Sequence, residues 1–153
     1  MKVLYRKPTP EQRKKLFSDT VLPRGVRTSA FEYVLRQMGV SGAILNQTTI
    51  QVYIKGIVPN GAAGQPKPSL VPSYSFQIYI AEYVLKDREE LSHTVAHELK
   101  HIVQWIRIIE RDGYVKAMKP LKWDEVNCER AGRRFRSVPF FRFDREDFKI
   151  ALP

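Results

Sequence analysis

The residues of this chain best suited to chemistry are His97, Glu98 and His101, which form the pattern His-Glu-x-x-His. On a helix, side chains four residues apart lie on one face, and two neutral imidazoles placed in this way can hold one Zn²⁺. Glu98 then lies beside the metal, where its carboxylate can accept a proton from a water molecule. The pattern therefore predicts a zinc site with a general base, although so short a pattern also occurs by chance.

Two further polar residues lie near this pattern. His93 is the remaining histidine of the chain, and on a helix it would lie about 12 Å along the axis from His101. One metal ion cannot reach both ends of that span and also His97, so we expect His93 to line the cleft or the surface. Gln104 lies one turn after His101 on nearly the same face, where it either supports the site from behind or fills the groove.

The histidines need a long helix to position them, and the sequence predicts one from about Arg88 to Arg111. Asp87 and Glu90 have the spacing of a capping box, and Gly113 is a typical stop. Apolar residues recur at helical spacing through the segment, namely Leu91, Val95, Leu99, Val103 and Ile106. A helix that is apolar on so much of its circumference should be central to the fold. Polar groups on it need partners, and a metal would provide them.

The segment from Trp123 to Phe135 supplies candidates for a third protein ligand, which catalytic zinc sites commonly have. It reads as a helix with Glu125 and Glu129 one turn apart on the same face. Two small residues, Cys128 and Gly132, each follow one of these glutamates by three positions. They would let this helix approach the histidine helix closely, as a shared metal requires.

With these two segments, over roughly residues 75–135, the chain resembles the gluzincin branch of the zincin metallopeptidases. More narrowly, it is similar to small single-domain H-E-x-x-H proteins of phages and prokaryotes. The resemblance implies a compact zincin-like α+β domain that hydrolyses peptide bonds of a peptide or protein substrate, with Zn²⁺ as cofactor and Glu98 as general base. Tyr114 or an arginine could stabilise the oxyanion, but nothing in the sequence selects one.

The third ligand has two possible assignments. In the first, Glu129-Arg-Ala-Gly132 matches the Glu-x-x-Ala stretch of the gluzincin pattern, and Glu129 joins His97 and His101 as a metal ligand. In the second, Glu125 binds zinc and Glu129 orients a histidine. Helical periodicity slightly favours Glu125, whereas the family pattern favours Glu129. We take Glu129 as the ligand and Glu125 as the alternative ligand or as a carboxylate that holds a ligating imidazole.

The remaining elements are expected to be two helices followed by a small sheet. Helical patterns cover about residues 10–19 and 29–39, and residues 48–57 and 75–84 alternate as two strands that should pair. The proline- and glycine-rich residues 58–74 between them are expected to form an irregular loop. By the resemblance, the 75–84 strand would guide an extended substrate, while the loop either shapes the cleft or takes no part.

The length of the chain fits one domain, residues 1–153, because a chain of this length can bury a genuine core. Lysine and arginine total 26 against 16 acidic residues, a net charge of +10. A basic surface attracts phosphates, so a nucleic-acid partner is possible, although no nucleic-acid-binding motif is present. The single cysteine, the lack of a signal-like N-terminus and the lack of a long apolar run predict a cytoplasmic protein without a membrane partner.

Two other functions remain open besides the peptidase. One is a zincin scaffold without useful proteolysis that acts as a binding or regulatory protein. The other is a basic nucleic-acid-associated protein similar to the SprT-like proteases, although the zinc-ribbon cysteines that many of those carry are missing. The aromatic tail, with Phe140, Phe141, Phe143 and Phe148, is expected to pack over an edge of the core.

Overall fold

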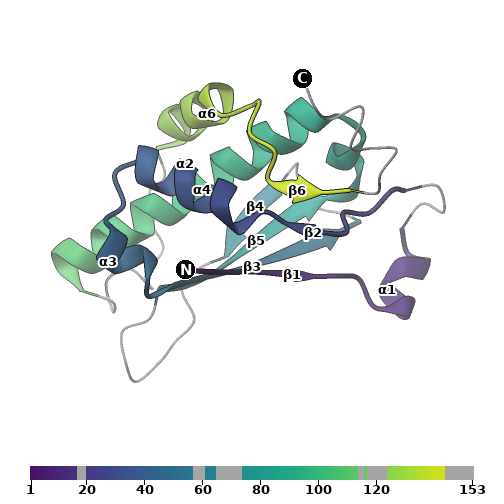
Figure 1. The fold of residues 1–153 in the computed structure, drawn as a ribbon, viewed down its shortest axis with the longest axis horizontal. Coiled ribbons are helices and arrows are strands. Elements are labelled where there is room, and N and C mark those ends of the chain that lie inside the picture. Colours follow the sequence, from purple (N-terminus) through teal and green to yellow (C-terminus); the bar gives the residue numbers. More distant parts are fainter. Residues whose placement is uncertain (17–19, 57–60, 65–73, 114–115, 117–123, 144–153) are drawn as a thin grey trace.

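The computed structural model describes residues 1–16, 20–56, 61–64, 74–113, 116 and 124–143. These form an α+β arrangement in which helices lie against one side of a mixed sheet (Figure 1). The sheet has the strand order β1 (Lys2–Arg6), β3 (Thr48–Lys55), β5 (Tyr74–Ala81) and β4 (Gly61–Gly64). Beside it lies a small ribbon of β2 (Gly25–Val26) and β6 (Phe141–Arg142). The helices are α1 (Pro10–Lys14), α2 (Thr28–Gln37), α3 (Gly42–Leu45), α4 (Arg88–Asp112) and α6 (Glu125–Arg134), with a 3-10 turn η1 (Glu82–Lys86).

The expected pairing of the two alternating segments is confirmed, since β3 and β5 run parallel and in register. Alternation along β3 buries Ile50, Val52 and Ile54 beneath the helices. The expected order of elements was wrong at its start, because the chain begins with β1, which pairs parallel with β3.

The loop expected over residues 58–74 contains a strand, so its prediction as wholly irregular was wrong. β4 has the sequence Gly-Ala-Ala-Gly, which shows no alternation of apolar and polar residues that would predict a strand. The strand is held by antiparallel backbone pairing to β5. Consequently β5 lies between β3 and β4. It therefore cannot be the edge strand that the sequence assigned to guiding a substrate, and in the described part of the chain β4 has that position.

The central helix agrees with its prediction. The Asp87 side chain accepts hydrogen bonds from the backbone N–H groups of Glu89 and Glu90, at 2.9 and 3.2 Å. At the other end Gly113 has φ of 91°, a conformation that favours glycine. α4 therefore begins and ends at the two signals found in the sequence.

The first two helices differ from their predictions. α1 ends at Lys14 rather than near residue 19, and it buries no side chain, so tertiary packing does not extend it. Residues 17–19 lie outside the described part. α2 begins at Thr28 and ends at Gln37, against the predicted 29–39, and the backbone N–H of its N-cap residue Arg27 donates to the carbonyl oxygen of Phe140 at 2.8 Å.

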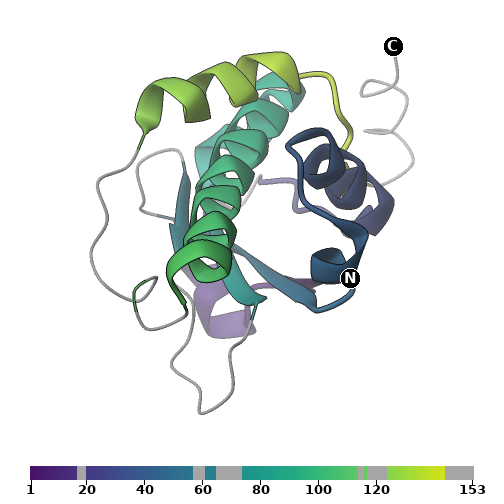
Figure 2. The same cartoon turned by 90° about the vertical axis from the view of Figure 1, so that its left-hand side faces the viewer.

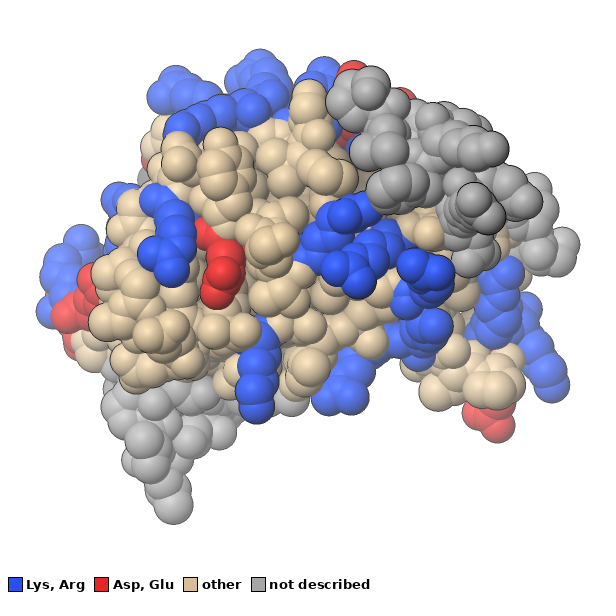
Figure 3. All heavy atoms as spheres, viewed as in Figure 1, with Lys and Arg blue, Asp and Glu red and all other residues tan. Residues whose placement is uncertain are grey.

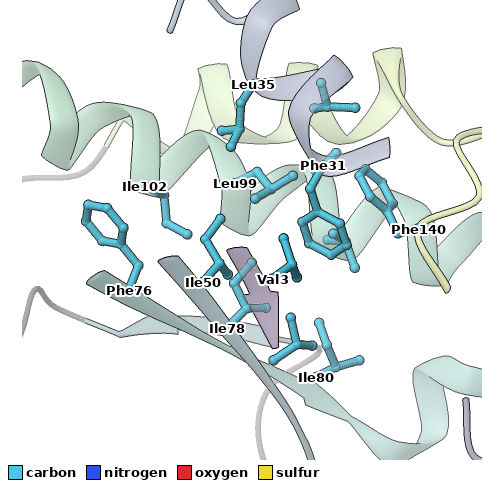
Figure 4. Packing of buried hydrophobic residues seen from close by; sticks show 14 of the residues in the cluster. Val3, Phe31, Leu35, Ile50, Phe76, Ile78, Ile80, Leu99, Ile102 and Phe140 are labelled. Carbon is cyan, nitrogen blue, oxygen red and sulfur yellow. The ribbon is translucent and has the colours of Figure 1, made fainter. Parts of the chain in front are cut away.

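The core lies between α4 and the sheet, where Leu99 and Ile102 face Ile50 and Ile78 (Figure 4). At one end of it the ring of Trp105 stacks on Phe76, with the ring centroids 6.1 Å apart. Phe140, Phe141 and Phe143 are buried, as expected for the tail, whereas Phe148 lies outside the described residues. Within the described part, no helix is both long enough and apolar enough to cross a bilayer.

Candidate metal centre

The site lies where α6 packs along the outer side of α4 (Figure 2). α6 turns Cys128, Ala131 and Gly132 inward, and all three are buried. A Cβ atom added to Gly132 would lie 2.8 Å from ring atoms of His93 and 2.9 Å from its backbone oxygen. The close approach of the two helices therefore requires glycine at this position, as the small residues in the sequence indicated.

Replacement of Gly132 by alanine is expected to destabilise the protein by about 1–2 kcal/mol. Overpacking costs roughly 1–3 kcal/mol, and the higher helix propensity of alanine offsets up to about 1 kcal/mol of that. Urea denaturation measures the change, with Gly25→Ala as the matched control, because a Cβ at Gly25 meets nothing within 4 Å. A Gly132→Ala protein as stable as the parent would contradict the tight helix contact.

The carboxylate of Glu125 bridges the two histidines of the pattern. Its Oε2 atom lies 3.1 Å from Nε2 of His97, and its Oε1 atom lies 3.1 Å from Nε2 of His101. The two imidazole rings have centroids 5.1 Å apart. Two imidazoles from α4 and a carboxylate from α6 thus meet, with each imidazole at a different oxygen of Glu125.

Glu129 contacts the other ring nitrogen of His97 and also reaches His93. Its Oε1 atom lies 2.7 Å from Nδ1 of His97, and its Oε2 atom lies 3.2 Å from Nε2 of His93. Burial acts to raise the pKa of Glu129, but the hydrogen bond to His93 and the charges of His97 and His93 outweigh it, so the pKa lies below its usual value. His93 therefore lies at the edge of the cluster beside Glu129, a position compatible with its prediction as a residue that lines the cleft or the surface.

The other ring nitrogen of His101 is held by Gln104. The Oε1 atom of Gln104 lies 3.3 Å from Nδ1 of His101, while its Nε2 atom donates to the carbonyl oxygen of Asp124 at 3.4 Å. Of the two roles left open for Gln104, the structure thus favours support of the imidazole from behind. Burial, followed by the neighbouring charge of His97, lowers the pKa of His101 despite the opposing effect of Glu125. A lowered pKa favours the neutral imidazole that a metal needs.

Glu98 is buried on α4, with only 5% of its surface exposed. Burial raises the pKa of the nearby Cys128 thiol to about 12, and the charges of Glu125 and Glu98 raise it further. The thiol is therefore neutral at ordinary pH. The Sγ atom lies 3.5 Å from Nδ1 of His101, on the side of the ring away from the Nε2 atom that faces Glu125.

Two combinations of three potential ligands have all their ligand atoms close together among the described residues, and Glu125 belongs to neither. His97, His101 and Cys128 form one, and His93, His97 and Glu129 form the other, with ligand atoms within 4.8 Å of one another in each. Cys128 was expected only to let the helices approach closely, and His93 was set aside as a ligand because of its distance from His101, although its spacing from His97 alone allows the second combination. Tyr114, a candidate for oxyanion stabilisation, lies outside the described residues.

Comparison of the chain with protein-family models, curated proteins and solved structures found no match. The resemblance to gluzincins therefore stays a prediction that rests on the two helices and their side chains.

Proposed function

We propose that the protein is a zinc-dependent metallopeptidase whose metal ligands are His97, His101 and Glu125. The observation that carries this proposal is the placement of the two oxygens of Glu125, each 3.1 Å from one histidine Nε2 atom. Ligands at about 2.0–2.1 Å from a tetrahedral zinc ion lie roughly 3.3 Å from one another. The donor types therefore suit zinc, and each contact between Glu125 and a histidine has about the spacing of two ligands on one ion.

In this proposal Glu129 exchanges its role with Glu125 and positions a ligand instead of binding the metal. Zinc-ligating histidines commonly have their second nitrogen held by a carboxylate or an amide oxygen. Glu129 lies 2.7 Å from Nδ1 of His97, and Gln104 lies 3.3 Å from Nδ1 of His101. Both contacts favour rings whose Nε2 atoms face Glu125.

When bound, zinc would lower the pKa of a coordinated water and polarise the scissile carbonyl. Glu98 would take the proton from that water and pass it to the leaving amine. Glu98 is buried on α4, so in this role it would act away from bulk water. The role follows from its place in the sequence, directly after His97 on α4.

We also infer a zincin-like arrangement for the fold. Support comes from the helix pair that holds the site and from the mixed sheet beneath it, whose antiparallel outer strand β4 packs against α4. An extended peptide can add as a further strand to such an edge. β4 thus takes the substrate-guiding part that the sequence assigned to residues 75–84.

Metal analysis of the purified protein tests the site directly. We expect about one zinc per chain, because one set of three protein ligands is proposed, and loss of that zinc in His97→Ala. His93→Ala is the matched control, since it removes a histidine from the same helix without removing a proposed ligand. Absence of zinc from carefully prepared protein, or equal loss in both variants, would overturn the assignment.

A further inference from the structure

The side of the sheet opposite α4 carries aromatic and basic side chains. Residues Gln51, Tyr53 and Lys55 alternate with the buried residues of β3 and therefore point away from the helices. In the strand register Tyr53 lies between two neighbours: Arg6 of β1 is beside it on one side, and Tyr79 of β5 is beside it on the other. The rings of Tyr53 and Tyr79 stack with centroids 5.3 Å apart and planes at 21°. The ammonium group of Lys55 lies 4.6 Å from the centroid of the Tyr79 ring.

A cavity of about 550 Å³ opens between the end of β3 and the segment that runs from β1 into α1. Its volume falls within the roughly 300–1,000 Å³ of small-molecule sites. The basic residues in its lining are Arg6, Lys7, Lys15 and Lys55, and all four are exposed. No aspartate or glutamate is among the described residues that line it. Figure 3 shows lysine and arginine side chains gathered around α1 and the adjoining end of β1.

The ring of Tyr53 is held in place at the wall of this cavity. Its hydroxyl group donates to Oε1 of Gln51 at 2.6 Å, and Nε of Arg6 donates to the same oxygen at 3.4 Å. Tyr53 lines the cavity whereas Tyr79 does not, so the part of the Tyr53 ring that borders the cavity is not the face covered by Tyr79. An aromatic surface and a guanidinium group are thus oriented together before any ligand binds.

We propose that this cavity binds one nucleotide of a single-stranded nucleic acid, with Tyr53 stacking on the base and the four cations contacting the adjoining phosphates. Aromatic rings beside a positively charged groove are the usual means of binding single strands. A ligand with both negative charge and a flat ring matches this lining, whereas the aspartate and glutamate side chains of an acidic peptide offer the charge alone. The bases of a duplex are paired and stacked and cannot reach Tyr53.

A strand fits this surface better than a free nucleotide. Exposed cations remain hydrated, so each contributes little to binding one isolated phosphate. Along a polyanion the same contacts release condensed counterions and their effects accumulate. The proposal does not depend on the metallopeptidase function, because the cavity is lined by residues from β1 to α1 and from the end of β3, whereas the proposed metal ligands lie on α4 and α6.

Fluorescence anisotropy of the full chain with labelled oligothymidine of about 12 nucleotides tests the proposal. At low salt we expect the affinity for the single strand to be at least about 10-fold higher than for a duplex of equal length, for thymidine monophosphate or for an acidic peptide. The reason is that the single strand offers both a run of phosphates and free bases. Equal affinity for the duplex, the mononucleotide or the peptide would overturn the proposal, as would the absence of binding.

Variants separate the stacking contribution from the charge contribution. Tyr53→Leu is expected to weaken binding by about 10-fold or more without changing its salt dependence, whereas Tyr53→Phe should bind as the parent does. The double variant Arg6→Ala/Lys55→Ala should lower the slope of log affinity against log salt by about 1.4, at roughly 0.7 per phosphate contact.

Two matched controls lie outside the cavity. Tyr33→Leu removes an exposed tyrosine from α2, and Lys2→Ala removes an exposed cation from the same face of β1 as Arg6. If either control weakens binding as much as its counterpart in the cavity, the affinity is diffuse and the site is wrong. Urea denaturation shows whether each variant is folded. If Tyr53→Leu fails to fold, the exposed Lys15→Ala tests the same cavity through its charge, and unchanged affinity in that variant would count against the site.

Discussion

Replacement of Glu98 by glutamine is expected to lower kcat/KM for peptide hydrolysis by about 10²–10⁴-fold, the range that a general acid–base group contributes. The substitution preserves the shape of the buried side chain and removes only its ability to take a proton. Zinc content should be unchanged, because Glu98 is not a proposed ligand. Hydrolysis of a peptide library, measured together with the zinc content of the same samples, provides the test.

Glu110→Gln is the matched control, since it makes the same chemical change at an exposed position on α4. It should hydrolyse peptides as the parent does. A zinc-loaded Glu98→Gln protein with full activity would rule out the proposed base. If the parent holds zinc but cleaves nothing in the library, the zincin scaffold serves binding or regulation instead of proteolysis.

The largest effect on metal affinity is expected from Glu125. Glu125→Ala removes one of three proposed protein ligands and should weaken zinc binding by more than about 100-fold, whereas Glu129→Ala, which removes the support behind His97, should weaken it by about 10–100-fold. Competition with a zinc chelator measures both affinities. Val126→Ala, an adjacent substitution on α6 at a side chain that is 66% exposed, should leave affinity unchanged.

The opposite order of the two glutamates would restore the assignment that the gluzincin pattern favours, with Glu129 as the ligand. Retention of parental affinity in both variants would point to a different third ligand. Cys128 is then the next candidate, because it groups with His97 and His101.

The parts of the fold that could be predicted are those whose side chains carry a complete local pattern. α4 has its cap at Asp87, its apolar period and its stop at Gly113. β3 and β5 alternate strongly enough to be recognised as neighbours. β4 could not be found in the same way, because Gly-Ala-Ala-Gly has no side-chain pattern and the strand exists through its pairing to β5.

The sequence was enough to predict which two helices form the site. It was not enough to predict which glutamate carboxylate contacts which histidine nitrogen. Glu125 and Glu129 lie on one face of α6, and helical spacing alone treats them as near equivalents. Their different partners depend on how far α6 slides along α4. That displacement is set by tertiary contacts such as the one between Gly132 and His93, which pair residues 39 positions apart in the sequence.

The two helices that form the metal centre are anchored to the protein very differently. α4 buries side chains along most of its length, whereas the ten residues of α6 bury only Cys128, Ala131 and Gly132. Cooperative units of a protein open with different free energies, and metal binding adds its free energy to the unit that it completes. We therefore expect α6 to open at a lower free-energy cost than α4, so that release of the proposed metal and global unfolding would be separate events.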